Sequence, residues 1–301
     1  VFMWAKGLEK NPIKVKFNLP EARNWKVATQ LQLQADGSYA APDLQYLMDS
    51  PVELSAHSLR SWKVADQDSE VTIHLALHHQ GTEQQLDIFT EKAKAVVVEQ
   101  QKIFGEYPQF DYGQYLFIAD YLPYVDGDGM EHRNSTILTD ERSLKEADYA
   151  QIETLSHEFF HAWNVERLRP ADLEPFDFQR ANMSRNLWFA EGVTNYYGKL
   201  VLSRTGHFDL ATYLDKTVTA LNKVQQSPGR QFFSATGMSE MAPFVDAAVS
   251  VDPTNYANSY ISYYTYGEVL GLALDLTLRT EFDGLSLDLL MRKLWRDFGK
   301  V

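Results

Sequence analysis

Residues 157–161 read His-Glu-Phe-Phe-His. This spacing brings the two histidine side chains close together if the segment is a helix. On a helix, positions i and i+4 lie on one face about one turn apart, so His157 and His161 can bind one zinc ion. Glu158 lies beside them and can reach a water on the metal. The segment therefore predicts a helix that carries a hydrolytic zinc site.

A catalytic zinc usually has three protein ligands and one open position. The chain has no cysteine, so the third ligand must be His, Asp or Glu. Glu191 is the best candidate, because it lies among apolar residues in a segment of helical character, Leu-Trp-Phe-Ala-Glu-Gly. Gly192 would let two helices approach closely at the metal, and Asn195, one turn on, can hydrogen-bond a ligand histidine. We predict one zinc ion per chain.

The charge balance restricts the partners. With 41 acidic and 28 basic residues, the formal net charge is −13 at pH 7. An acidic surface argues against binding to nucleic acid or to an anionic membrane. No apolar run reaches the length of a membrane span, so we expect a soluble protein, either cytoplasmic or periplasmic. The sequence does not determine the oligomeric state. The chain starts at Val1 rather than Met, which suggests a processed or trimmed piece.

The patterns along the chain predict an α+β fold with two domains, residues 1–80 and 81–301. Val71, Ile73 and Leu75 alternate with less apolar residues, which is the period of a half-buried strand. The first domain is predicted to be antiparallel β, and helices dominate after residue 148. Further predicted elements are strands at 25–33, 51–59, 115–119 and 131–138, helices at 85–104, 268–280 and 287–296, and a loop at 121–130.

Three finer expectations follow from local patterns. Asp148 with Gln151 resembles a capping box for the helix that carries the two histidines. The apolar stripe of the 268–280 helix is expected to be core; it consists of Leu270, Ala273, Leu274 and Leu278. The run Asp-Gly-Asp-Gly at 126–129 lacks the spaced ligands of a calcium loop and is interpreted as a flexible loop.

Three motifs resemble the glycyl aminopeptidase family of zinc metallopeptidases, in the gluzincin clan. They are Gly-Met-Glu-His-Arg-Asn-Ser-Thr at 129–136, His-Glu-Phe-Phe-His-Ala-Trp-Asn at 157–164 and Trp-Phe-Ala-Glu-Gly at 188–192; Asp-Ser-Pro-Val-Glu at 49–53 is similar too. The resemblance implies a β domain, then a thermolysin-like catalytic domain with a mainly helical C-terminal part, often followed by a PDZ domain. The chain has no PDZ-like segment and a short β domain, so we expect a fragment of a longer protein.

The resemblance also implies roles for two further groups. Gly129, Met130 and Glu131 resemble the Gly-x-Met-Glu-Asn signature of zinc aminopeptidases, whose Glu binds the substrate's α-amino group; His132 replaces the Asn. A carboxylate there can form a strong charge-assisted bond to an ammonium. Tyr-Thr-Tyr-Gly at 264–267 resembles the Tyr-x-Lys-Gly segment whose Tyr stabilises the oxyanion. Tyr264 is the candidate donor, and Tyr263 remains an alternative.

Together these features predict a zinc-dependent aminopeptidase that acts on peptides with a free N-terminus. The family name suggests Gly or other small residues as the preferred N-terminal residue. Two alternatives stay open: a zinc endopeptidase, in which Glu131 holds no amine, and a catalytically dead peptide-binding scaffold. Glu158 argues against the scaffold, because a protein that only bound zinc or peptide would not need it.

Overall fold

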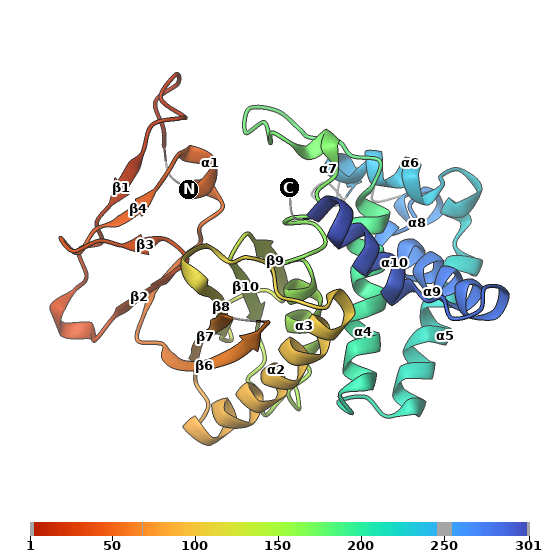
Figure 1. The fold of residues 1–301 in the computed structure, drawn as a ribbon, viewed down its shortest axis with the longest axis horizontal. Coiled ribbons are helices and arrows are strands. Elements are labelled where there is room, and N and C mark those ends of the chain that lie inside the picture. Colours follow the sequence, from red (N-terminus) through yellow and green to blue (C-terminus); the bar gives the residue numbers. More distant parts are fainter. Residues whose placement is uncertain (1–2, 68, 246–254, 300–301) are drawn as a thin grey trace. The chain divides into compact units, whose positions relative to one another are not determined.

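The structure, a computed structural model, describes residues 3–67, 69–245 and 255–299 (Figure 1). Its residues form two units by their contacts. The first unit comprises residues 1–98 and 106–162, and the second comprises residues 99–105 and 163–301.

A five-stranded sheet organises the first unit, in the order β6-β7-β8-β10-β9. Its strands are β6 (Ser58–Asp66), β7 (Ser69–His79), β8 (Gln114–Tyr121), β9 (Asp128–His132) and β10 (Ser135–Asp140). The β6–β7 and β9–β10 pairs are antiparallel, whereas β7–β8 and β8–β10 are parallel. A parallel pair needs a long crossover, and α2 (Glu83–Phe104) supplies it between β7 and β8. The predicted strands at 71–78 and 115–119 and the helix at 85–104 are confirmed.

Helices cover one face of this sheet. The Tyr115 ring lies 5.0 Å from that of Phe159 in α3 (Ile152–Phe160), and the Tyr121 ring lies 5.7 Å from that of Phe89 in α2. All four side chains are at most 2% exposed, so this face forms the apolar core of the first unit. The core therefore supports α3, the helix that carries the histidine pair.

Shorter strands complete the first unit. They form a two-stranded sheet, β2 (Lys26–Thr29) with β5 (Val52–Ser55), and a three-stranded sheet, β1 (Ile13–Val15), β4 (Tyr39–Ala41) and β3 (Gln32–Leu33), beside α1 (Leu44–Met48). The strand predicted at 25–33 is thus two strands in different sheets. The break falls at Gln30, whose buried side chain donates to the Asp49 carbonyl and to Ser50 Oγ.

The single strand predicted at 131–138 is wrong, because a hairpin occupies this segment. β9 and β10 pair across a two-residue turn at Arg133 and Asn134, with Glu131 opposite Thr136. Glu131 therefore lies near the end of β9 instead of opening a strand. The predicted loop at 121–130 likewise contains the start of β9, from Asp128.

Helices build most of the second unit. The α-helices are α4 (Thr194–Arg204), α5 (Leu210–Gln226), α6 (Ala235–Glu240), α7 (Ala242–Val245), α8 (Tyr256–Ser259), α9 (Tyr263–Glu281) and α10 (Leu287–Leu294). Within the part of the chain that the structure describes, two segments are π-helical, η4 (Trp188–Val193) and η6 (Trp295–Gly299). The 3₁₀ segments of the same residues are η1 (Glu21–Arg23), η2 (Asp111–Gly113), η3 (Ala171–Leu173) and η5 (Pro228–Gln231). The helices predicted at 268–280 and 287–296 correspond to α9 and to α10 with the start of η6.

The buried face of α9 differs from the predicted one. Leu270 and Leu274 are 37% and 38% exposed, whereas Gly267, Gly271 and Asp275 are buried. Asp275 can be buried because its carboxylate accepts several hydrogen bonds. The donors are Tyr196 Oη, the Leu287 backbone N–H and Arg279 Nε. Close backbone packing and polar contacts, not leucines, hold this helix in place.

The predicted α+β class is confirmed: a β-rich N-terminal part precedes a helical C-terminal part (Figure 1). The predicted domain boundary at residue 80 stays a prediction. Among the described residues, no helix combines the length and apolarity needed to cross a bilayer.

Candidate active site

The two motif histidines lie at the C-terminal end of α3. Their Nε2 atoms are 3.0 Å apart and their ring centroids 4.7 Å apart. His161 is 1% exposed, and His157 is partly exposed. Two imidazole nitrogens that converge from successive turns form the first half of a tetrahedral zinc site. The donor chemistry of this helix therefore fits zinc.

The predicted capping box on this helix is wrong. Asp148 lies before α3 in the left-handed region, with a φ of 48°. The Gln151 amide donates to the carbonyls of Arg142 and Ser143 instead of reaching back to a capping residue. The side chain thus ties the start of α3 to the loop after β10.

Glu158 lies directly against strand β9. It is 5% exposed, and a Cβ built at Gly129 would be 2.3 Å from Glu158 Oε1. No real Cβ tolerates such a contact, so only glycine at 129 leaves room for the carboxylate. A structural reason therefore exists for a glycine in the Gly-Met-Glu motif.

Glu131 comes from the same strand and lies beside the zinc motif. Glu131, Glu158 and His161 each offer a ligand atom, and these atoms lie within 4.8 Å of one another. Because side chains alternate along a strand, Gly129 and Glu131 share one face of β9. Met130 lies on the opposite face and is 55% exposed. The structure thus brings together five of the predicted site residues within the first unit: Gly129, Glu131, His157, Glu158 and His161.

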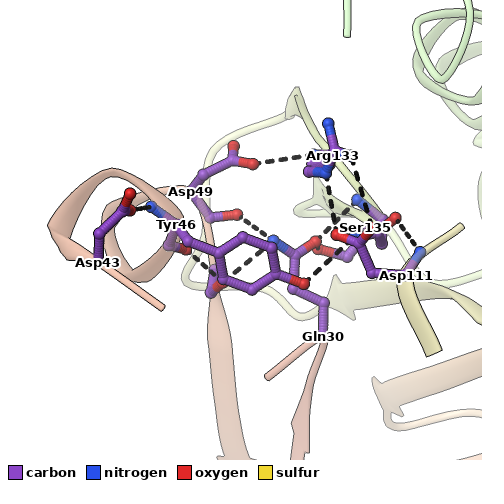
Figure 2. Close-up of polar contacts among 9 residues, drawn as sticks. Gln30, Asp43, Tyr46, Asp49, Asp111, Arg133 and Ser135 are labelled. Atoms are coloured by element: carbon purple, nitrogen blue, oxygen red, sulfur yellow. Dashed lines mark hydrogen bonds and ion pairs between the residues drawn. The ribbon is translucent and has the colours of Figure 1, made fainter. Parts of the chain in front are cut away.

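A hydrogen-bond network fixes the turn that follows Glu131 (Figure 2). Asp49 accepts from the Arg133 backbone N–H at 3.0 Å, and its other oxygen lies 2.9 Å from His132 Nδ1. Gln30 Oε1 accepts from the Asn134 backbone N–H and from Ser135 Oγ, both at 2.9 Å. The turn is therefore held by Gln30, which lies between β2 and β3, and by Asp49, which follows α1.

Asp111 holds the turn from its other side. Arg133 Nε and Asn134 Nδ2 both donate to this carboxylate at 2.9 Å (Figure 2). Burial opposes its charge, but these donors lower the pKa of Asp111 below its ordinary value. Burial and the nearby Asp111 charge raise the pKa of Tyr46, whose hydroxyl accepts from Asn134. No local pattern in the sequence reveals these tertiary partners.

Glu191 belongs to the second unit, on the π-helix η4, where it is partly exposed. The surrounding backbone is tied down by two buried polar residues. Asn164 Nδ2 donates to the carbonyls of Phe189 and Ala190 and to Thr194 Oγ1, and Thr194 Oγ1 donates to the Ala190 carbonyl. Asn164 was visible only as the last residue of the His-Glu-Phe-Phe-His-Ala-Trp-Asn motif, with no role assigned.

Two glycines bring η4 and α9 into backbone contact. A Cβ at Gly192 would lie 2.3 Å from Gly267 Cα, and one at Gly267 would lie 2.0 Å from the Trp188 carbonyl oxygen. The predicted close approach of two helices at Gly192 is confirmed. The helix that carries Glu191 and the helix that begins with the candidate tyrosines therefore pack as one piece.

The two candidate tyrosines differ in burial. Tyr263 is 3% exposed, in an apolar cluster with Val224, Met238 and Ile261. Tyr264 is partly buried at the edge of this cluster, and its ring stacks on that of Tyr263 at 4.8 Å. Tyr264 is thus the more accessible of the two side chains at the start of α9.

Two family models match the chain. The model of the M61 peptidase N-terminal domain covers residues 1–56, and that of the M61 glycyl aminopeptidase covers residues 150–270. Together they span more than half of the sequence. The chain belongs to the M61 peptidase family.

Solved structures share the fold of this chain. The M61 chain resembles the crystal structure of an aminopeptidase N family protein from Idiomarina loihiensis, with a TM-score of 0.81 and 27% identity over 98% of this chain and 51% of the other. An M1 zinc metallopeptidase from Deinococcus radiodurans shares the fold, with a TM-score of 0.56 and 12% identity over 96% of this chain and 56% of the other. A mutant of that enzyme bound to a Tyr-Ser-Ala substrate has a TM-score of 0.58, also at 12% identity over 96% of this chain and 56% of the other.

The M61 chain spans about half the length of the solved structures that it matches. No curated protein matches it. The comparisons thus support a metallopeptidase family and its fold.

Proposed function

We propose that this M61 chain carries the active site of a zinc-dependent aminopeptidase that removes N-terminal residues, Gly or other small ones, from peptides. The observation that carries the proposal is the grouping of Glu131, Glu158 and His161 within 4.8 Å. The Glu158 carboxylate follows the first motif histidine on α3, and the Glu131 carboxylate faces Glu158 from β9. Two carboxylates in different surroundings suit two different tasks.

His157, His161 and Glu191 are the proposed zinc ligands. The histidine pair supplies two nitrogen donors on one helix face, and the absence of cysteine leaves a carboxylate or a further histidine as the third. When bound, zinc polarises the scissile carbonyl and lowers the pKa of a coordinated water towards about 7. Asn195, one turn beyond Glu191, is proposed to orient a ligand histidine.

Glu158 is the proposed general base. Its carboxylate takes a proton from the attacking water and delivers it to the leaving amine. Its contact with Gly129 restricts where the carboxylate can lie, which favours a fixed proton path. Tyr264 is proposed to donate a hydrogen bond to the oxyanion as its charge develops.

Glu131 is proposed to bind the substrate's α-ammonium, with Gly129 on the same face of β9 lining the N-terminal position. Met130 was predicted to share this role, but its side chain lies on the opposite face of the strand. A carboxylate at the position of Glu131 would bind the substrate's free α-amine only when the enzyme cuts the peptide bond after the substrate's first residue. The hydrogen-bonded turn after Glu131 keeps β9 in one register (Figure 2). Glu131 would therefore select the end of a peptide over its interior.

Paired substrates test this function. The zinc-loaded chain should cut free peptides one residue at a time and cut their N-acetylated forms far more slowly, because acetylation removes the charge that Glu131 binds. Glu131→Ala should slow the free peptide by about 30-fold or more and remove most of the preference, in line with roughly 2–5 kcal/mol for a lost ion-pair partner. Glu141→Ala, an exposed acid just after β10, is the matched control and should change neither rate. Mass spectrometry of the products gives the order of cleavage.

Glu158→Gln separates an enzyme from a scaffold. This variant should keep zinc and the fold but lower kcat by at least about 10²-fold. Internal cleavage of blocked peptides at the rate of free ones would favour the endopeptidase. A zinc-loaded wild type without activity on either peptide would favour the scaffold.

A further inference from the structure

A second cluster of metal-ligating side chains lies in the first unit, away from the zinc motif. His78 and Asp120 are directly paired in the parallel ladder of β7 and β8, so their side chains share one face of the sheet. Glu53, from β5, reaches the same place. None of the three has a role in the proposed reaction, and Glu53 is the last residue of the Asp-Ser-Pro-Val-Glu motif.

The surroundings of this cluster are apolar on its inner side. The same sheet face continues with Ala76 and Ile118, which pack with Ala28 and Leu116 in a buried cluster. The side chains of Glu53, Asp120 and His78 are 15%, 22% and 33% exposed. The three groups are thus drawn together at the edge of a sheet-to-sheet contact and remain reachable by a small ion.

Their distances suit ligands of one metal ion better than hydrogen bonds. His78 Nδ1 lies 3.5 Å from Glu53 Oε1 and 3.5 Å from Asp120 Oδ1. An N–H···O hydrogen bond usually measures about 2.7–3.2 Å. Nitrogen and oxygen ligands bind zinc at about 2.0–2.2 Å in a tetrahedron, which places two ligand atoms roughly 3.3–3.5 Å apart.

The Asp120 oxygen is costly to bury without a cation. Oδ1, the atom nearest to His78, is buried and has no hydrogen-bond partner. The Glu53 carboxylate approaches the same His78 nitrogen, so two negative charges lie close together at this place. A divalent ion between the two carboxylates would offset both costs.

We propose that Glu53, His78 and Asp120 form a second metal site, for zinc or another divalent first-row transition ion. One imidazole and two carboxylates are a ligand set that such ions accept, with an open position left for water. All three ligands come from strands: His78 and Asp120 from the five-stranded sheet, and Glu53 from β5 of the two-stranded sheet. The site is independent of His157, His161 and Glu191 and does not rest on the proposed peptidase activity.

Zinc stoichiometry tests the proposal. The purified chain is dialysed against buffered zinc at pH 7.5, and bound zinc is measured by mass spectrometry of the metal. The wild type should hold two zinc ions, whereas His78→Ala and Asp120→Asn should each hold one. The double variant His157→Ala with His161→Ala should still hold one, which distinguishes failure of this site from failure of the catalytic one.

His74→Ala is the matched control. His74 lies four residues earlier on the same face of β7, where its Nδ1 is 2.8 Å from Ser61 Oγ, and its loss should leave two zinc ions. Circular dichroism identifies any variant that fails to fold, and Asp120→Asn, which keeps the side-chain shape, decides the result if His78→Ala is such a variant. A wild type with one zinc that the double variant loses would overturn the proposal, as would two zinc ions in Asp120→Asn.

Discussion

Gly129 controls where the Glu158 carboxylate lies. A Cβ at this position would be 2.3 Å from Oε1 and 2.7 Å from Cδ of Glu158. The backbone of β9 is fixed by its ladder with β10, so the flexible glutamate would have to move. A side chain that moves costs little stability, but a displaced general base costs rate.

Gly129→Ala should therefore lower kcat by about 10²-fold, as misplacement by about 1 Å can do, while zinc content stays unchanged. The free energy of unfolding should fall by less than about 2 kcal/mol, because the conflict is with the side chains of Glu158 and Thr154 and not with backbone. Gly127→Ala is the control, since a Cβ there would meet its nearest atom at 3.7 Å. Full turnover in Gly129→Ala would contradict the role given to Glu158.

The two adjacent tyrosines should respond differently to loss of the hydroxyl. Tyr264→Phe should lower kcat by about 10²-fold with a smaller change in KM, because the hydrogen bond strengthens as charge develops. Tyr263→Phe should leave kcat near the wild-type value, since this side chain is buried in the apolar cluster of the second unit. Steady-state kinetics of both variants decide between them, and the opposite pattern would reassign the donor to Tyr263.

Site residues close together in sequence could be predicted, and those held by distant contacts could not. His157, Glu158 and His161 lie within one helical turn, so their spacing alone indicates their chemistry. The role of Asn164 depends on carbonyls 25 and 26 positions away. The turn after Glu131 depends on Gln30, about a hundred positions earlier, which no local pattern reveals.

Among the elements, the contact between η4 and α9 depends most on residue size. Gly192 and Gly267 face each other, and neither leaves room for a methyl group. Periodicity predicted the α9 helix but favoured its leucines as the buried face, because leucine burial is the usual source of helix packing. Here the helix buries small and hydrogen-bonded residues, which a hydrophobic pattern cannot identify.

Gly267→Ala should separate these two helices. Its Cβ would meet backbone, the Trp188 carbonyl oxygen at 2.0 Å, so the free energy of unfolding should fall by about 1–3 kcal/mol or more. Gly271→Ala, one turn along the same helix, meets Tyr196 Cβ at 3.4 Å, an ordinary contact, and should be neutral or stabilising by up to about 1 kcal/mol. Urea unfolding of both variants gives the comparison. Equal effects would mean that the close approach at Gly267 does not determine stability.

At the scale of the whole molecule, His157 and His161 belong to the first unit and Glu191 belongs to the second. The α+β order of the chain could be predicted, because the periods of strands and helices are local patterns. The division of residues between the two units could not be predicted in this way. Residues 99–105 belong with the second unit, although α2, which ends there, begins in the first.

Removal of zinc should destabilise the folded chain, because an ion that binds only the folded state stabilises it by about 2.7 kcal/mol at a hundred times its Kd. The His78→Ala variant keeps only the proposed catalytic zinc site, so a chelator should lower the midpoint temperature of its thermal unfolding. Adding Glu191→Ala to that variant should abolish the shift. Differential scanning calorimetry with and without chelator measures both. A chelator shift that persists without Glu191 would exclude this residue as a ligand.

The network around the β9–β10 turn has a consequence for the order of folding. Gln30 and Asp49 are synthesised 104 and 84 positions before the backbone N–H groups that they bind. A chain that folds from its N-terminus would present these acceptors before the hairpin is complete. The N-terminal strands then act as a template on which the hairpin closes. Long-range contacts of this kind form slowly. The strand that carries the proposed amine-binding carboxylate would accordingly reach its final position only after the segment with Gln30 and Asp49 is in place.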